Sequence, residues 1–195
     1  SETGSVGIQG VIDLRTRKRP VKVRLSARQF ELSTLPLGIG LSGRVGLDVR
    51  VSGPLKRPVV KGRARIARPC WQSPYREEPL CYRRFDTEGQ WSADRFDVSR
   101  FTLRDDARVL LDVAGRGRIR TRAFDGQISV NRFPLKVINH FVKKPLPLEG
   151  SVTTRLNLSG TLKEPRGEGR IEFHDAGYET YRLGGAELNI QADTE

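Results

Sequence analysis

Two stretches of the chain repeat one another without a gap, about a hundred positions apart. Residues 41–66 read LSGRVGLDVRVSGPLKRPVVKGRARI, and residues 148–173 read LEGSVTTRLNLSGTLKEPRGEGRIEF. Ten of the 26 aligned positions are identical, including a Ser-Gly pair and the Leu-Lys-x-Pro run that follows it. Self-similarity at a fixed offset indicates that one supersecondary unit recurs along the chain, which favours an elongated architecture.

Each copy predicts two strands joined by a short connection. In the first copy Val45, Leu47, Val49 and Val51 alternate with small or charged residues. A period of two places alternate side chains on opposite faces of a strand. The Ser-Gly pair then interrupts the alternation. The proline that follows cannot donate to a ladder, so it marks a turn, an edge or the first residue of a strand.

The same alternation continues over most of the remaining sequence. It predicts an all-β, mostly meandering chain of roughly ten to twelve strands. Helical spacing of apolar residues occurs at 134–142, where we expect a short helix between the repeat copies, and a second short helix is predicted at 27–32. We treat 1–195 as one β-rich unit with repeat copies near 35–66 and 142–173.

The apolar face of the predicted sheet is the candidate binding surface. Its expected members are Val45, Leu47, Val49, Val51, Val109, Leu111, Val113, Val152, Leu156, Leu158, Leu188 and Ile190. A sheet with one apolar face must hide that face. It can close as a barrel, pack as a sandwich, or curve into a trough that holds an apolar ligand, and composition does not separate a filled core from a lined groove.

The chain is strongly basic, with 35 Lys and Arg against 23 acidic residues and a net charge of +12. This balance attracts anionic surfaces. The basic residues alternate with apolar ones, however, as on the solvated face of a sheet, and the run at 15–19 reads as an exposed turn. No helix-turn-helix, zinc module or aromatic RNA-binding motif accompanies the charge, so we expect no nucleic-acid partner.

Cys70 and Cys81 lie in a segment, 67–89, that contains three prolines and reads as an insertion-like loop. Their spacing fits a disulfide that closes a loop of roughly a dozen residues. In an oxidising compartment this bridge is expected, whereas two free thiols are the default in the cytosol. One cysteine pair without further ligands does not make a metal site.

No arrangement of residues predicts catalysis. His140 and His174 lack motif partners, and the adjacent acids of 77–78 and 105–106 point apart on strands or turns. No nucleophile triad, phosphate-binding loop or metal-ligand spacing is present, so we expect no enzyme, cofactor or metal. The sequence contains no Met and no apolar run of about 18 residues. We therefore expect a piece of a longer protein whose anchor or export signal lies elsewhere.

The repeat carries a family resemblance. SGTLKEPRGEGRIEF at 159–173 and SGPLKRPVVKGRARI at 52–66 resemble the signature of the TamB family, which are AsmA-like proteins of the translocation and assembly module. FPLKVINHFV at 133–142 resembles the family's link between repeats, and QWSADRFDVSRFTL at 90–103 is similar to a further part. The resemblance covers most of the chain and is weakest at 67–89. The motif consists of Gly, Pro and apolar spacing rather than catalytic residues.

The resemblance implies an elongated curved β-sheet with an apolar trough, the "β-taco". It also implies a periplasmic part of a protein anchored in the inner membrane of a Gram-negative envelope, with an Omp85-type outer-membrane partner similar to TamA. The family is linked both to phospholipid transport and to outer-membrane protein assembly, and no catalytic residues are assigned in it.

Three functions remain open at this point. The trough could carry phospholipid acyl chains between the membranes, because each buried methylene contributes about 0.8 kcal/mol. An open sheet edge or the trough could instead hold nascent outer-membrane proteins by strand addition. A sealed core would make the chain a structural spacer. Exposed apolar surface and open edges also predict self-association.

Overall fold

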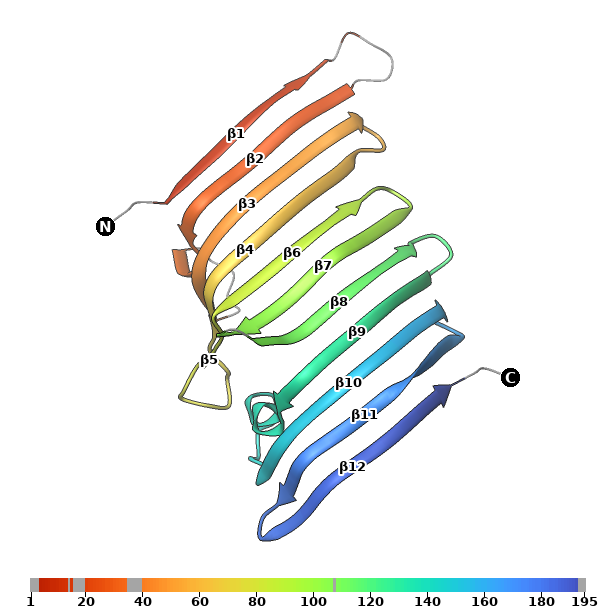
Figure 1. The fold of residues 1–195 in the computed structure, drawn as a ribbon. Coiled ribbons are helices and arrows are strands. Elements are labelled where there is room, and N and C mark those ends of the chain that lie inside the picture. The colour runs from red at the N-terminus through yellow and green to blue at the C-terminus, as the bar shows by residue number, and fades with distance from the viewer. Residues whose placement is uncertain (1–3, 14, 16–19, 35–39, 107, 193–195) are drawn as a thin grey trace.

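The computed structural model describes residues 4–13, 15, 20–34, 40–106 and 108–192, which form one open antiparallel sheet (Figure 1). Its strands are β1 (Ser5–Ile12), β2 (Pro20–Glu31), β3 (Leu41–Pro54), β4 (Val59–Trp71), β5 (Leu80–Cys81), β6 (Arg84–Trp91), β7 (Arg95–Asp105), β8 (Arg108–Arg118), β9 (Ala123–Pro134), β10 (Leu148–Thr161), β11 (Pro165–Tyr178) and β12 (Tyr181–Ala192). The predicted elongated, curved, all-β sheet is confirmed.

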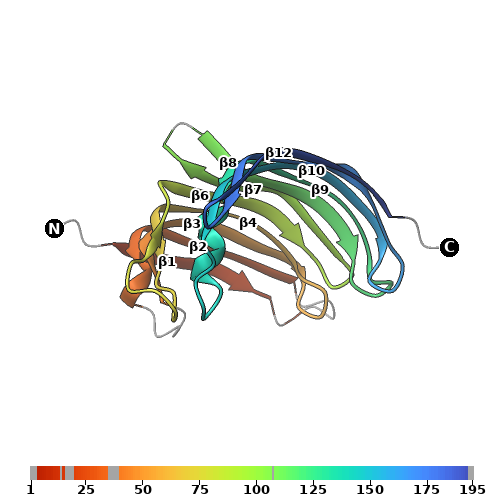
Figure 2. The ribbon, with the colours of Figure 1, turned by 90° about the horizontal axis from the view of Figure 1, so that it is seen from below.

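The strand order follows the sequence, as in a meander. It runs β1-β2-β3-β4-β6-β7-β8-β9-β10-β11-β12, and the two-residue strand β5 pairs beside the end of β4. Seen from below in Figure 2, the strands arch, and the first and last strands lie at the two ends of the stack. No other described strand pairs with the outer side of β1 or β12, so both edges are open.

The connections alternate between two rims of the sheet (Figure 1). One rim, which we call the hairpin rim, contains the tight turns at 55–58, 92–94, 119–122 and 162–164. The opposite rim, the helix rim, contains two 3-10 helices, η1 (Leu32–Thr34) and η2 (Leu135–His140), and the loop at 72–83 around β5. The longest described connections therefore lie at the helix rim.

The short helix predicted between the repeats corresponds to η2, but the helix predicted at 27–32 is wrong. Residues up to Glu31 continue β2, which is bulged between Ala27 and Phe30, and η1 follows. Gln29 has a φ of 50° at this bulge, so the local backbone is neither regular strand nor helix. Within the insertion-like segment 67–89, residues 67–71 end β4 and residues 84–89 belong to β6, so 72–83 is the projecting part.

The two repeat copies are the hairpins β3–β4 and β10–β11, apart from residues 35–39, which lie outside the described residues. Gly53 and Gly160 occupy the same place before the hairpin turn, and both have a φ of 100°. This backbone conformation strains every residue with a side chain, which explains why glycine recurs at this place. Pro58 and Pro165 stand at or next to the first residue of the following strand, where a missing N–H is tolerated.

Replacing Gly160 by Ala tests this turn. The added Cβ meets the carbonyl oxygen of Glu164 in addition to the unfavourable φ. We expect the free energy of unfolding to fall by about 2 kcal/mol in urea denaturation. Gly46→Ala is the matched control, because nothing lies within 4 Å of a Cβ at Gly46. Equal stability of the two variants would contradict the turn argument.

Candidate functional site

Cross-strand register gathers the predicted apolar residues into rows that run across the sheet, perpendicular to the strands. One row begins at Val45 and continues strand by strand through Ile66, Phe85, Leu103, Leu111, Val130, Thr154, Ile171 and Leu188. The next row contains Leu47, Ala64, Thr87, Phe101, Val113, Ile128, Leu156, Gly169 and Ile190. Neither row includes a charged residue, so the apolar face is continuous from β3 to β12.

A third row consists largely of glycine. It contains Val49, Gly62, Gly89, Val98, Gly115, Gly126, Leu158 and Gly167. A Cβ on Gly115 would lie 3.0 Å from the carbonyl oxygen of Asp125, and one on Gly62 would lie 2.9 Å from Val49 Cγ2. Glycine therefore permits a close approach of neighbouring strands here and leaves a furrow in the apolar face, in which only Val49, Val98 and Leu158 carry side chains.

A fourth row lies between this furrow and the hairpin rim and is rich in aromatic residues. It contains Val51, Val60, Trp91, Phe96, Gly117 and Phe124. The Trp91 side chain is 61% exposed. The furrow is thus bordered by aliphatic residues on one side and by aromatic rings on the other.

The structure places most of the predicted groove residues on this face, with Val152 joining it through its partner Phe133. Val109 differs. The ladder between β7 and β8 shifts register so that Leu111 pairs with Leu103, whereas Val109 pairs with Arg104. The extra residue, Leu110, is buried with 6% exposure. Because of this bulge, Val109 lies in register with residues of the polar face, such as Arg104, and not with the apolar rows.

The apolar face has no second layer over most of its area in the described part of the chain. Among all the described residues only five hydrophobic ones are buried, namely Val21, Ala27, Leu110, Val137 and Ala176, and no large side chain is less than 2% exposed. Exposure rises toward both edges, to 72% for Ile8 and 53% for Leu188. A filled sandwich core would bury such residues completely, so the described residues form a lined, open surface.

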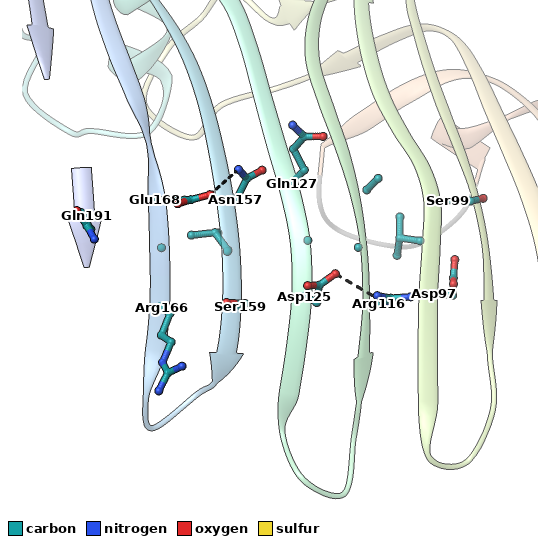
Figure 3. A pocket seen from close by; sticks show the side chains of 16 residues that line it. Asp97, Ser99, Arg116, Asp125, Gln127, Asn157, Ser159, Arg166, Glu168 and Gln191 are labelled. Carbon is teal, nitrogen blue, oxygen red and sulfur yellow. Dashed lines mark hydrogen bonds and ion pairs between the residues drawn. The ribbon is translucent and has the colours of Figure 1, made fainter. Parts of the chain in front are cut away.

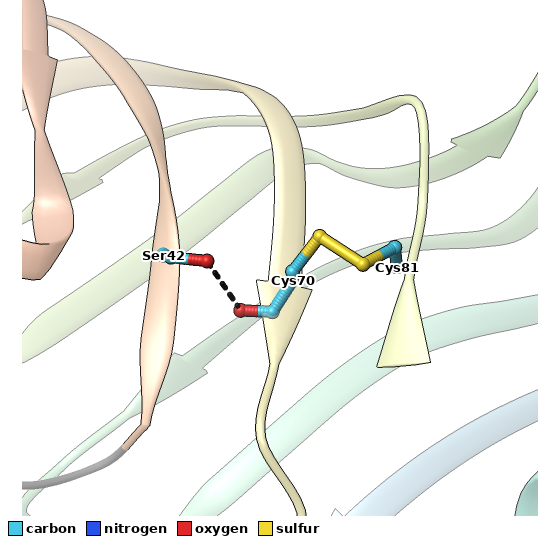
Figure 4. Close-up of a disulfide and its surroundings, with 3 residues drawn as sticks. All are labelled: Ser42, Cys70 and Cys81. Atoms are coloured by element: carbon cyan, nitrogen blue, oxygen red, sulfur yellow. Dashed lines mark hydrogen bonds between the residues drawn. A yellow bond between two sulfur atoms is a disulfide. The ribbon is translucent and has the colours of Figure 1, made fainter. Parts of the chain in front are cut away.

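A covering appears at the helix rim, where the loop at 72–83 meets η2. Trp71 stacks on Phe141 with ring centroids 4.9 Å apart, and the buried Ser73 hydroxyl donates to the carbonyl of His140 at 2.6 Å. Cys70 and Cys81 are disulfide-bonded at the base of this loop (Figure 4). The loop leaves β4 and η2 follows β9, so this contact, which we call the clasp, spans the ends of the strands between them.

The clasp lies on the apolar side of the sheet. Tyr82 stacks on Phe133, the register partner of Val152. Burial, together with the negative charge of Asp105, raises the pKa of Tyr82 to about 12. The clasp joins the ends of β4 and β9 directly on one face, so these strand ends lie closer together there than they would in a flat sheet. The clasp therefore holds the sheet bent toward its apolar side at this rim.

The opposite face is charged, and its charges pair across strands. The carboxylate of Asp48 accepts two hydrogen bonds from Arg24, at 2.8 and 3.2 Å, and lies 3.9 Å from Arg50 and Arg63. The hydrogen bond from Arg24 lowers the pKa of Asp48 despite some burial. These pairs keep the polar side chains ordered along the ladders and leave a large excess of arginine on β2–β4.

A shallow hollow on the polar face of β7–β12 is also lined by mutually paired groups (Figure 3). Asn157 donates to Glu168 at 3.2 Å, and Arg116 lies 3.6 Å from Asp125.

His174 contacts the Thr153 hydroxyl at 3.0 Å, and His140 lies in the clasp. Among the described residues there is no group of three His, Cys, Asp or Glu side chains that could hold a metal ion. The described helices are also too short and polar to cross a membrane.

The sequence did not indicate the clasp or the glycine row. Trp71 and Phe141 are separated by about a third of the chain, and no local pattern joins them. The glycines of the third row are visible individually, but only the register between strands aligns them.

Removing the disulfide tests the clasp. In the variant Cys70→Ser/Cys81→Ser we expect the free energy of unfolding to fall by about 3 kcal/mol, because the loop gains freedom in the unfolded chain. Hydrogen exchange should also become faster at Val137 and its neighbours. Phe141→Ala is the companion variant, which removes the aromatic contact and keeps the bridge, at an expected cost of about 1 kcal/mol. Unchanged exchange in η2 in both variants would show that the loop does not hold η2.

A second prediction concerns Asp86, whose side chain is 12% exposed and lies 2.8 Å from Arg65 and 2.6 Å from Arg84. Burial raises the pKa of Asp86, but hydrogen bonds from Arg84 and Arg65 outweigh it and bring the pKa below its ordinary value of 3.8. Its stabilising effect is therefore complete above this value and is lost as the pH falls through the lower, folded-state pKa.

We expect Asp86→Asn to lower the free energy of unfolding by about 1 kcal/mol at pH 7. The difference from the wild type should shrink below pH 3.8. Urea denaturation across this pH range measures both effects. Asp125→Asn serves as the control, because Asp125 is 66% exposed and its ion pair is longer. A difference that persists unchanged at low pH would contradict the assignment.

Comparison with known proteins agrees with this architecture. The family model described as "TamB, N-terminal domain" matches residues 22–173, which is more than half of the chain. The match includes both repeat hairpins, the clasp and most of the apolar rows. No curated protein and no solved structure matches the chain. The chain belongs to the TamB family.

Proposed function

We propose that this part of the protein is a non-enzymatic periplasmic bridge that carries phospholipid between the inner and outer membranes along its apolar face. The observation that carries the proposal is an apolar surface, free of charged residues, that crosses the sheet from β3 to β12 and remains uncovered over most of its area. Membership of an envelope family that transports lipid or protein supports it.

The rows give acyl chains a direction. They run perpendicular to the strands, so a chain lying in the glycine furrow would pass from one strand to the next every 4.8 Å or so. Leu158 and Val98 would contact it from within the row, and the aromatic rings of Trp91 and Phe96 would border it. Each methylene removed from water contributes about 0.8 kcal/mol, so partial contact gives binding that is useful and reversible.

A sliding ligand needs a surface without deep traps. The rows have the same character on each successive strand, and the polar residues among them are neutral threonines such as Thr87 and Thr154. A headgroup would remain at a rim, in water, where Lys and Arg are frequent. Binding energy then changes little between neighbouring positions, as a conduit requires.

A second function, assembly of outer-membrane β-barrel proteins with an Omp85-type, TamA-like partner, is favoured by a different observation. All residues of β1 and β12 are exposed, and neither strand has a described partner on its outer side. An open edge can accept a strand of a nascent barrel protein by β-augmentation. The same edges provide a route to self-association.

Photo-crosslinking distinguishes the two functions. Crosslinkable residues at Leu47 and Leu156 face the apolar rows, and the neighbours Asp48 and Arg155 face the opposite side as matched controls. We expect phospholipid adducts, detected by mass spectrometry after isolation from cells, at the first pair and not at the second. Equal adducts at both pairs would contradict the groove.

A charge placed in the rows gives an independent check. Leu111→Arg/Leu156→Arg puts two cations on the apolar face, and we expect at least a tenfold loss of bound phospholipid because burying a charge is unfavourable. Arg155→Leu/Asp112→Leu changes the same strands on the other face and should retain lipid. Capture of barrel strands along β12, without lipid in the rows, would instead establish the assembly function.

A further inference from the structure

The hairpin rim displays large apolar side chains that have no role in a core. Leu55 is 47% exposed, Ile119 is 43% exposed and Leu162 is 71% exposed. Each lies in a different turn, following β3, β8 and β10 respectively. Turns of this kind ordinarily present small polar residues to water.

The same exposed leucine occurs in both copies of the repeat. Leu55 and Leu162 are equivalent positions of the two copies, and each is followed by lysine, at Lys56 and Lys163. The glycines before them are needed for backbone geometry, whereas the turn itself does not require leucine. A leucine that recurs in an exposed turn indicates a contact made outside the described chain.

The tips are also held in place. The backbone N–H of Ile119 donates to the carbonyl of Asp94 at 2.9 Å, and that of Leu162 donates to the carbonyl of Arg122 at 3.3 Å. Three successive turns are therefore linked to one another through their backbones. Within the last turn, Thr161 and Glu164 exchange further hydrogen bonds at 3.1 Å. The side chains of Ile119 and Leu162 consequently project from a braced edge.

The charge of these turns has one dominant sign. The segments 55–58, 92–94, 119–122 and 162–164 contain five basic residues and two acidic ones. The basic residues, all exposed, are Lys56, Arg57, Arg120, Arg122 and Lys163. The helix rim differs in charge, because the exposed acids Glu77, Glu78, Asp106 and Glu179 offset most of its basic residues.

We propose that the hairpin rim docks on a membrane surface rich in anionic phospholipid. The leucine and isoleucine tips enter the boundary between headgroups and acyl chains, and the neighbouring Lys and Arg side chains contact phosphate groups. This docking site is separate from the apolar rows. Because the rim runs parallel to the rows, docking lays this part of the sheet along the membrane, with the aromatic border of the furrow, at Trp91 and Phe96, next to the lipid surface. This orientation suits the loading of lipid into the rows rather than the spanning of the periplasm.

A membrane suits the tips better than a protein partner does. Successive hairpins place their tips roughly 10 Å apart, since each hairpin occupies two strand spacings. Single apolar side chains at this spacing do not form the contiguous, closely packed core of a protein interface. A fluid headgroup layer accommodates each tip separately, and charge complementarity supplies the remaining attraction.

Vesicle flotation tests the proposal. The probes are vesicles of phosphatidylcholine alone and vesicles in which about a third is phosphatidylglycerol. The tip variant is Leu55→Ser/Ile119→Ser/Leu162→Ser, and the charge variant is Arg120→Gln/Arg122→Gln/Lys163→Gln. The matched control, Arg28→Gln/Arg100→Gln/Arg108→Gln, removes the same charge from exposed positions outside the hairpin rim. Circular dichroism and thermal unfolding confirm that each variant folds.

We expect the wild-type chain to float with the anionic vesicles only. Loss of three basic contacts should weaken this binding on the order of 100-fold in the charge variant, and the control should lose far less. The tip variant should also bind more weakly, at least tenfold, although its net charge is unchanged. The trough variant Leu111→Arg/Leu156→Arg should still dock, so failure of lipid carriage and failure of docking are separate results.

Several results would overturn the docking site. If the charge variant and the control lost vesicle binding equally, the binding would depend on the net charge of the chain and not on the hairpin rim. Equal binding to both kinds of vesicle, or full binding by the tip variant, would show that the hairpin rim is not the surface that binds the membrane. Self-association that the tip variant abolishes, without vesicle binding by the wild type, would identify the rim as an interface between copies of the chain.

Discussion

Cross-strand register is the constraint on which the rest of this structure depends. Side chains alternate with a period of two, so a slip of one residue between any two strands would move a whole strand's apolar set to the charged face. Despite bulges in most ladders, the apolar rows remain aligned from β3 to β12. Charge pairs on the outer face, such as Arg24 with Asp48 and Arg65 with Asp86, favour the same register that aligns Leu47 with Ala64. Both faces therefore specify one pairing.

Curvature comes from places where this regular pairing is relaxed. Bulges interrupt β3 near Ser42 and β10 near Gly150, at equivalent positions of the repeat, and a further bulge displaces Leu110. Bulges bend a strand and increase its twist. The glycine row permits close approach between strands in the middle of the sheet, and the clasp joins distant strands at one rim. Together they give a bent sheet with one open rim, which a flat sheet of the same composition would not provide.

The sequence predicted what local periodicity encodes. The alternation at Leu47 and Val49 was sufficient to assign them to one face, and the recurring Gly and Pro located both hairpins. Features that depend on two distant segments were not predictable. The bulge at Leu110 shifts Val109 off the apolar rows without any change in the alternation of apolar residues, because the pairing partner on β7 determines it. The contact of Trp71 with Phe141 likewise depends on how far the intervening strands bend.

An uncovered apolar face carries a cost that the rest of the molecule must offset. In a globular domain such a face would supply most of the stability, but here it remains half exposed, so the ladders, the braced turns and the disulfide contribute a larger share. The densely charged opposite face keeps such a sheet in solution and discourages stacking through the polar side. Residues such as Leu158 and Ile190 then remain available to a ligand. A stable closed domain would cover its apolar face. A binding surface that crosses the whole sheet instead requires that one face stay uncovered while the other, charged face keeps the sheet in solution.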